Sequence, residues 1–473
     1  MTVSEVSAGW LAGRIGERTA RGIAAEVTDL IRGGSLAAGT RLPTVRRLAI
    51  ELGVSPATVS EAWSTLRRSR AIATQGRNGS VVIGPPEIAH PERYERLGDF
   101  GQLPTLDLTI ATPDPALLPP LGAALAAGAR TERLNDYSRE RITPALLEAV
   151  SRDWPFPAQS HLAVGGGFEG MQLACQALAS PGDRIAIEHP TAARLLDILE
   201  ASGVTLIPVS CDDQGPEPES LAAALRAKPV AFIYQPRGQT PCGHWVTVER
   251  SARLAELLGA SGAIVLEDDG LGPVSVAPPT SIGTHLPERT VLVRSYSKSH
   301  GPDLRIAVLG GAAEIVDRVR VLRSFGTGWT SRILQDALAH LLGDPDVRTL
   351  VEQARGRYAQ RRGRMADALR ARGVHTAGSD GLALWVPVAD EAEALVTLAA
   401  HGIAAAPGSR YCVAPLEPHL RVATSRLPED DEALGSLADI FALAARNRRE
   451  GRARIPRGAV GQSLDRAAIR TIS

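Results

Sequence analysis

Beyond Leu106, short apolar runs alternate with longer amphipathic stretches, and this alternation constrains the fold more than any other feature of the sequence. The apolar runs are predicted to be strands, and they cover residues 185–187, 204–209, 230–234, 263–266, 291–293 and 306–309. Helical stretches lie between several of them, for example at 192–201 and 248–258. This order predicts a doubly wound α/β domain, whose ligand site lies at the carboxyl ends of the strands.

One of these strand ends carries an unusual residue. The run 291–293 leads into Ser295-Tyr296-Ser297-Lys298, and Lys298 is one of only two lysines among 52 basic residues. Arginine cannot replace lysine where an amine must lose its proton and attack a carbonyl, because guanidinium stays charged. We interpret Lys228 as a surface residue and Lys298 as a candidate nucleophile.

The other strand ends suggest what Lys298 serves. Gly165-Gly166-Gly167, followed by Phe168 and Glu169, precedes a helix predicted over 171–178, and free N–H groups at such a helix end suit a phosphate. Asp268 follows the 263–266 strand, where a carboxylate can hold a protonated ring nitrogen. Arg305 comes seven residues after Lys298 and is a candidate phosphate clamp. Glycine turns before helices are common, and a solvated acidic loop is the alternative for Asp268.

Taken together and in this order, these groups predict a site for pyridoxal phosphate. Lys298 would form the Schiff base with the cofactor, and Asp268 would keep the pyridine nitrogen protonated. The hydroxyls of Ser295 and Ser297, Arg305 and the helix end at Gly167, Phe168 and Glu169 would hold the phosphate.

The first ninety residues have a different pattern. A helix is predicted over 15–31, a second is capped by Thr44, and a third starts at Ser55-Pro56 after the tight turn at Gly53. Two short helices joined by a glycine turn predict a helix-turn-helix, whose second helix can enter the major groove of DNA.

Two strands predicted at 71–74 and 80–83 enclose the glycine-rich tip 75–79, which contains Arg77 and has the character of a wing. Between Arg41 and Ser80 there are seven arginines and two acids, an excess of five positive charges on a chain whose net charge is +0. Arginines on such a module neutralise phosphates or read guanine edges. A protein-interaction domain with a basic face is the alternative.

This module resembles the winged helix-turn-helix of the GntR family of bacterial regulators. The resemblance runs through residues 42–49, 52–55, 58–59 and 76–80. It implies that Arg46, Ser55, Thr58 and Arg77 touch DNA. The residues that start the first of the two helices, Thr44 and Arg47, are included in the same predicted interface.

The longer region resembles the fold-type-I aminotransferases, through 180–184, 239–243, 267–269, 295–305 and 420–422. The resemblance implies that Lys298 carries the cofactor, that Asp268 pairs with its pyridinium nitrogen and that Arg305 binds its phosphate. It also implies that Arg421 binds the carboxylate of a substrate or effector and that Tyr137 reaches the cofactor of a partner subunit. A winged helix joined to such a domain resembles the MocR subgroup of GntR regulators.

Several positions depart from the aminotransferase pattern. An aromatic residue that stacks on the cofactor ring is replaced by Ala192, and a tyrosine that bonds its phenolic oxygen is replaced by Gly270. Thr240, which we include among the cofactor-binding residues, stands where the family has an asparagine or a bulky residue. Lost stacking and a lost polar contact each cost on the order of 1 kcal/mol.

The predicted domains are a DNA-binding domain at 1–84, a linker at 85–105, an aminotransferase-like domain at 106–445 and a basic tail at 446–473, for which a mobile end is the first interpretation and non-specific DNA contact the second. The four cysteines form no CxxC or zinc-like spacing, so we expect a reduced, cytoplasmic protein without a metal site. Neither a signal peptide nor an apolar run of membrane-spanning length is present, so no membrane partner is expected.

These features lead us to expect a homodimeric regulator that binds double-stranded operator DNA and whose second domain binds pyridoxal phosphate and senses it or an amino compound. Two alternatives remain open. One is an active aminotransferase with an accessory DNA-binding module, which Ala192 and Gly270 disfavour. The other is a regulator whose degenerate pocket no longer binds the cofactor.

Overall fold

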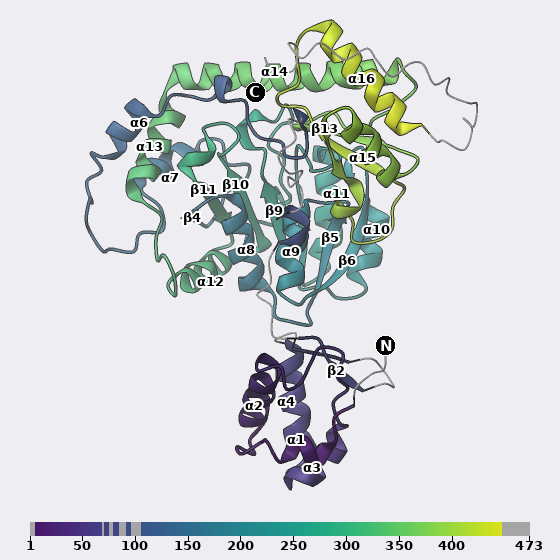
Figure 1. The fold of residues 1–473 in the computed structure, drawn as a ribbon. Helices are drawn as coiled ribbons and strands as arrows, with labels where there is room; N and C mark the ends of the chain where they lie inside the picture. Colours follow the sequence, from purple (N-terminus) through teal and green to yellow (C-terminus); the bar gives the residue numbers. More distant parts are fainter. Residues whose placement is uncertain (1–4, 69–70, 75–78, 85–90, 96–105, 447–473) are drawn as a thin grey trace, which may run out of the picture. The chain divides into compact units, whose positions relative to one another are not determined.

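The structure is a computed structural model that describes residues 5–68, 71–74, 79–84, 91–95 and 106–446 (Figure 1). The chain divides into two compact units, Met1–His90 and Pro91–Ser473. Within the described residues, no helix combines the length and apolar character that a bilayer span needs.

The first unit is a small helical domain with a two-stranded hairpin. Its elements are α1 (Ala8–Ala12), α2 (Ala20–Arg32), α3 (Val45–Leu52), α4 (Pro56–Arg68), β1 (Ile72–Thr74) and β2 (Ser80–Val82). Leu48, Trp63 and their apolar neighbours are almost fully buried in one core. The helix predicted over 15–31 begins only at Ala20, because Thr19 caps it by accepting a hydrogen bond from the Gly22 N–H at 3.0 Å.

Local sequence signals place the helix-turn-helix where it was predicted. The hydroxyl of Thr44 accepts from the Arg47 N–H at 3.4 Å at the start of α3. Gly53 ends that helix with φ 66°, a left-handed conformation that glycine adopts without a steric penalty. The Ser55 hydroxyl then accepts from the Thr58 N–H at 3.1 Å in the first turn of α4.

The predicted hairpin is also present. β1 and β2 pair antiparallel with Ile72 opposite Val82 and Thr74 opposite Ser80. The tip of the wing with Arg77 lies outside the described residues, as does the tail from 447 onward.

The second unit is organised around an eight-stranded sheet with the order β4-β11-β10-β9-β8-β5-β6-β7. The strands are β4 (Ser160–Val164), β5 (Arg184–His189), β6 (Thr205–Asp212), β7 (Gly215–Pro216), β8 (Ala231–Tyr234), β9 (Ile264–Asp269), β10 (Thr290–Ser295) and β11 (Ala307–Gly311). The five strands from β10 to β6 in this order run parallel, whereas β11 is antiparallel to both β10 and β4.

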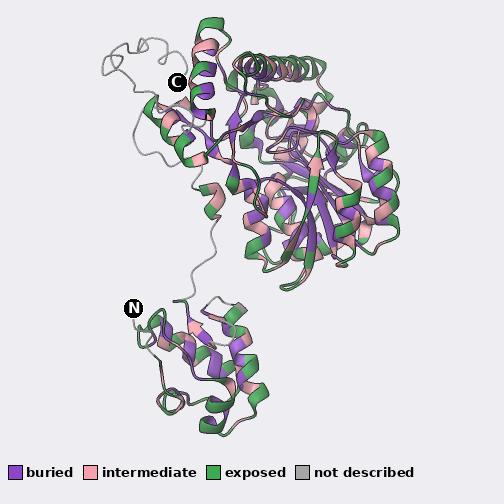
Figure 2. Cartoon of the chain, turned by 90° about the vertical axis from the view of Figure 1, so that its right-hand side faces the viewer, coloured by how far each residue is buried: buried purple, intermediate pink, exposed green. Residues whose placement is uncertain are grey.

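Helices cover both faces of this sheet. One face packs its core against α8 (Gly167–Leu178), α9 (Ala193–Ala201) and α12 (Ala313–Arg323). The other packs against α10 (Pro218–Leu225) and α11 (Val248–Gly259). Figure 2 shows the buried strands between helices whose outer faces are exposed. This is the layered arrangement that the strand–helix alternation predicts.

The sequence patterns did not predict the other helices and the smaller sheet of the second unit. Its helices are α6 (Gly122–Gly128), α7 (Pro144–Ser151), α13 (Arg332–Gly343), the 26-residue α14 (Pro345–Arg370), α15 (Glu391–Ala400) and α16 (Asp431–Ala445). A smaller antiparallel sheet has the order β12-β15-β14, from β12 (Ala383–Pro387), β15 (His419–Ala423) and β14 (Ala406–Pro407). It packs with α14, α15 and α16 in a separate apolar core.

Candidate functional site

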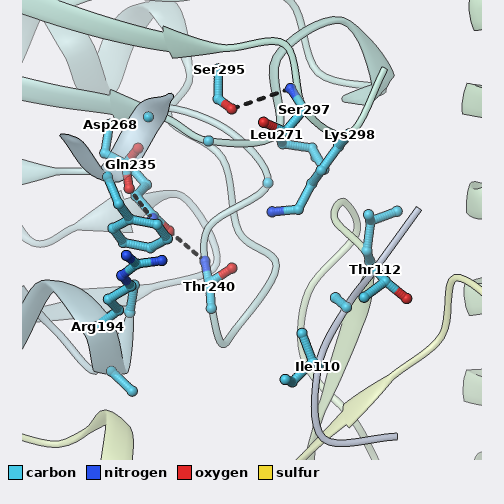
Figure 3. Close-up of a pocket in the computed structure, with 18 of the residues that line it drawn as sticks. Ile110, Thr112, Arg194, Gln235, Thr240, Asp268, Leu271, Ser295, Ser297 and Lys298 are labelled. Atoms are coloured by element: carbon cyan, nitrogen blue, oxygen red, sulfur yellow. Dashed lines mark hydrogen bonds between the residues drawn. The ribbon is translucent and has the colours of Figure 1, made fainter. Parts of the chain in front are cut away.

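Lys298 lies three residues beyond the end of β10, where its amine enters a pocket of about 280 Å³. Figure 3 shows the amine pointing across this pocket toward the side that carries Asp268 and Gln235. Burial and the nearby Arg421 lower the pKa of Lys298, while Asp268 opposes that shift. Within the described residues, no hydrogen bond or ion pair engages the amine, which therefore remains available for chemistry.

Asp268 faces Lys298 from the end of the neighbouring strand, β9. Burial raises its pKa to about 6, against the opposing effects of a hydrogen bond from Gln235 and of the Lys298 charge. Gln235 Nε2 donates to Asp268 Oδ2 at 2.8 Å, and Gln235 Oε1 accepts from the Thr240 N–H at 2.6 Å. The backbone of Thr240 therefore orients the side-chain amide of Gln235, which in turn holds Asp268. Thr240 also lines the pocket itself.

The adjacent Asp269 has a structural role. Its carboxylate accepts from Arg237 at 2.9 and 2.8 Å and from Arg294 Nε at 2.8 Å, and all three side chains are buried. The charges of Arg237 and Arg294 lower its pKa despite burial. Its charge is neutralised within the protein, which leaves Asp268 as the carboxylate that faces the pocket.

Arg305, Ser295 and two glycines form a cradle at the start of α8. Gly166, with φ 112°, packs so closely on Arg305 that an added Cβ would lie 3.1 Å from a guanidinium nitrogen. An added Cβ on Gly167 would likewise lie 3.1 Å from the Ser295 Cβ. Arg305 itself adopts φ 49°, which is rare outside glycine and is found at functional sites. Gly167, Phe168, Ser295, Ser297 and Arg305 all line the pocket.

Two predicted cofactor residues are not part of this lining. The Glu169 carboxylate turns back to accept from the Gly165 N–H and lies 3.9 Å from Arg323. Tyr137 is 86% exposed and packs edge-on against Trp329 in a different hollow, with ring centroids 5.7 Å apart. Glu169 was included in the predicted phosphate site because it follows the glycine run directly in the sequence. In the structure α8 starts at Gly167 rather than Met171, so the first helical turn directs Glu169 away from the pocket.

Arg421 enters the pocket from β15 of the smaller sheet. It is buried and donates to the Thr109 carbonyl at 2.7 Å, while its Nε has no hydrogen-bond partner among the residues that the structure describes. The Tyr411 ring lies 5.9 Å from its guanidinium carbon. An incompletely satisfied, buried guanidinium is suited to bind a carboxylate.

Apart from Arg77, which lies outside the described residues, the predicted DNA-contacting residues lie at the start of α3 and α4. Thr44, Arg46, Arg47 and Ser55 are exposed, and Thr58 is half-buried. The side chains of Arg46 and Arg47 form no ion pair with any other described residue, so both guanidinium groups remain free for phosphates or base edges.

Comparison with known proteins supports both the DNA-binding character of the first unit and the aminotransferase-like character of the second. Residues 19–82 match the family model "Bacterial regulatory proteins, gntR family", and residues 107–437 match "Aminotransferase class I and II". The chain is 31% identical over 427 residues to the vitamin B6 salvage pathway transcriptional repressor PtsJ of Salmonella typhimurium, covering 89% of this chain and 97% of that protein. This protein is a GntR-family transcriptional regulator of the MocR type.

A second relative is the pyridoxine biosynthesis transcriptional regulator PdxR of Corynebacterium glutamicum, 25% identical over 354 residues, 73% of this chain and 77% of that protein. Among solved structures, the kynurenine aminotransferase of Pyrococcus horikoshii superimposes with a TM-score of 0.68 at 19% identity, over 76% of this chain and 96% of that one. The latter likeness establishes the aminotransferase fold of the second unit.

Two further departures from the aminotransferase pattern, besides Thr240, lie in the pocket of this MocR-type regulator. Ala192 and Gly270 line it directly. An added Cβ on Gly270 would lie 3.3 Å from Asp268 Oδ1, so a larger residue there would have to displace a neighbour. The cradle, the amine and the carboxylate fit pyridoxal phosphate, while the surroundings of its ring differ from those of an aminotransferase.

Sequence reasoning missed several pocket residues, among them Arg194 and Tyr94. Arg194 follows Ala192 by two positions. The sequence comparison considered only the aromatic residue that Ala192 replaces, and did not consider Arg194. Tyr94 belongs to α5 (Glu92–Glu95), inside the segment predicted to be a linker. Proline-punctuated, mixed sequence gave no sign that this segment would enter a binding site.

Glu188 and His244, both buried, and the half-buried Cys211 bring their potential metal-ligating atoms within 4.8 Å of one another. His244 Nε2 lies 3.6 Å from one carboxylate oxygen of Glu188, and the other carboxylate oxygen accepts from the Thr191 hydroxyl at 3.2 Å. None of the three residues lines the pocket, and we interpret the group as polar packing of the fold.

Proposed function

We propose that this regulator binds pyridoxal phosphate at Lys298 and that occupancy of the pocket, by the cofactor or by an amino compound that reacts with it, changes the affinity of the first unit for operator DNA. The observation that carries the proposal is the amine of Lys298, unpaired within the described residues, opposite Asp268 in one pocket with a cradle at Arg305.

Each group would have a separate task. Arg305, Ser295, Ser297 and the start of α8 at Gly167 would hold the phosphate, with Phe168 as a neighbouring apolar wall. Asp268 would pair with the ring nitrogen, and Thr240 would support it through Gln235. When bound, pyridoxal phosphate supplies a carbonyl that reacts with primary amines.

Lys298 would bind that carbonyl covalently, since its lowered pKa increases the fraction of neutral amine. Arg421 would take a ligand carboxylate at the side of the smaller sheet. The pocket therefore suits an amino acid or a similar amino compound as well as the cofactor.

DNA recognition would use Arg46, Arg47, Thr44, Ser55, Thr58 and Arg77. The domain limits that we propose are 1–84 for this module, 85–105 for the linker and 106–445 for the cofactor domain, with a basic tail at 446–473. A homodimer would place two modules on one operator, and the exposed Tyr137 would reach the cofactor of the partner subunit, as the fold family implies. A cytoplasmic location follows from DNA as the partner.

The names of PtsJ and PdxR support vitamin B6 metabolism as the regulated process. An active aminotransferase is the second candidate, favoured by the Lys298 and Asp268 pair but disfavoured by Ala192 and Gly270. Turnover of an amino donor and a keto acid that is abolished in Lys298→Ala would establish that second candidate.

The regulatory proposal is tested by DNA binding. Fluorescence anisotropy with DNA from the region upstream of the protein's own coding sequence is measured with and without pyridoxal phosphate. We expect the operator affinity to change at least about fivefold, a coupling of about 1 kcal/mol. Lys298→Ala should bind DNA but lose this response, whereas Lys228→Ala should retain it. An identical affinity with and without the cofactor in the wild type would refute the proposal.

A further inference from the structure

Arg194, at the start of α9, lines the pocket without a polar partner among the described residues. Its guanidinium carbon lies 4.8 Å from the centroid of the Phe168 ring and 5.0 Å from that of Tyr94. Figure 3 shows Arg194 on the side of the pocket opposite Ile110 and Thr112. Aromatic faces hold a guanidinium by cation–π attraction and leave its N–H edge free to donate.

The charges around the pocket indicate what that edge binds. The lining residues include five cationic side chains, Arg194, Arg237, Lys298, Arg305 and Arg421, but one carboxylate, Asp268. Arg237 is already paired with Asp269. With Arg305 assigned to the cofactor phosphate and Arg421 to a ligand carboxylate, Arg194 is a cation that no proposed group neutralises. A partly buried charge of this kind favours an anionic partner.

Tyr94 connects this cation to the linker. It lies in α5, which begins ten residues after β2 ends in the DNA-binding module. The Asp197 carboxylate on α9 accepts from the backbone N–H groups of Arg93 and Tyr94 at 3.2 and 3.1 Å. The Arg93 guanidinium donates to both carboxylate oxygens of Glu200 at 2.6 Å. These contacts hold α5 against the same helix that presents Arg194.

We propose that Arg194 binds a second anionic group of the pocket's ligand and that Tyr94 makes the linker helix α5 part of this subsite. The ligand is then an amino compound with two acidic groups, one at Arg421 and the other at Arg194. Binding at Arg194 stabilises the packing of Tyr94 on it, and so fixes the chain close to the end of the DNA-binding module. The inference rests on the proposed function, because it needs a ligand in the cofactor pocket.

Matched pairs of amino acids test the subsite. Protein loaded with pyridoxal phosphate is titrated with aspartate and asparagine, glutamate and glutamine, and phosphoserine and serine, and the absorbance of the bound cofactor gives each Kd. At least one acid should bind about tenfold more tightly than its neutral partner, the size of one charge-assisted hydrogen bond. Arg194→Gln should abolish that preference, and Arg194→Lys should retain part of it. A wild type without any preference, or an unchanged preference in Arg194→Gln, would overturn the subsite.

Hydrogen exchange of the amides at 92–95 tests the link to α5. The preferred acid should slow exchange there at least about threefold in the wild type and in Tyr94→Phe, which keeps the ring, but not in Tyr94→Ala or Arg194→Gln. Equal exchange with and without the acid in the wild type contradicts the coupling. A protein that takes up no pyridoxal phosphate refutes the proposed function, whereas a loaded protein without these differences refutes only this inference.

Discussion

At the residue scale, the two carboxylates at the end of β9 illustrate how environment separates identical side chains. Asp269 is neutralised by Arg237 and Arg294, so its pKa is lowered, whereas Asp268 has one amide partner and faces the pocket, so burial raises its pKa to about 6. The sequence placed an acidic pair at a strand end. Spacing alone could not tell which member faces the ligand, because the partners that decide this come from β8, β10 and the loops beyond them; only the resemblance to aminotransferases selected Asp268.

The raised pKa of Asp268 leads to a stability prediction. Its folded-state pKa exceeds its unfolded value, so the native state binds more protons between about pH 4 and 6, and the free energy of unfolding falls as pH rises through that window. Asp268→Asn removes a buried charge and should raise the stability of the cofactor-free protein by about 1–2 kcal/mol at pH 7.5.

Thermal denaturation from pH 5 to 8 checks this expectation. The gain in Tm should shrink toward pH 5, where Asp268 is already protonated. A variant that is less stable than the wild type at pH 7.5 would show that the carboxylate is net stabilising.

Arg305 offers a second prediction at this scale. Arg305→Gln keeps a hydrogen-bond donor but removes the charge beside the cradle, so the affinity for pyridoxal phosphate should fall about 10- to 100-fold. Arg289→Gln provides the control, because Arg289 donates to the carbonyls of residues 258, 259 and 261 and does not line the pocket. Equal losses in the two variants, measured by titrating the cofactor absorbance, would remove Arg305 from the phosphate site.

At the element scale, the sequence predicted the elements that local rules specify. Caps at Thr44 and Ser55 and the left-handed Gly53 define the helix-turn-helix, and the apolar runs define β5, β6, β8, β9, β10 and β11. β4 was not predicted because its burial pattern is mixed. The helix α14 was not predicted because arginines such as Arg361 and Arg362 lie buried among its apolar residues. The antiparallel direction of β11 depends on strand pairing across the sheet, which no local pattern records.

Two glycine substitutions should have opposite effects on these elements. Gly53→Ala forces a Cβ into a left-handed conformation and should destabilise the DNA-binding module by about 1 kcal/mol. Gly356→Ala, in the exposed middle of α14 with open space around it, should stabilise its unit by about 0.5–1 kcal/mol. Thermal unfolding, monitored by circular dichroism, measures both effects. A Gly53→Ala variant that is more stable than the wild type would contradict the left-handed turn at Gly53.

At the scale of the whole molecule, a neutral chain concentrates positive charge in one module and one pocket. The excess of five charges between Arg41 and Ser80 predicts DNA binding that weakens steeply with salt. Arg46→Ala and Arg47→Ala should each weaken operator binding, and for a phosphate contact the slope of log affinity against log salt should fall by about 0.9. Arg130→Ala, in the second unit, is a charge-matched control; if it alters the slope as much, the contact assigned to α3 is wrong.

The central claim is that Lys298 tethers a sensed cofactor, and the chain's scarcity of lysine makes this directly measurable. The protein is incubated with pyridoxal phosphate, reduced with borohydride and mapped by peptide mass spectrometry. We predict a visible absorbance band before reduction and a stable adduct on Lys298, present in Lys228→Ala and absent from Lys298→Ala. A colourless protein, or an adduct found on Lys228 instead, would contradict the account.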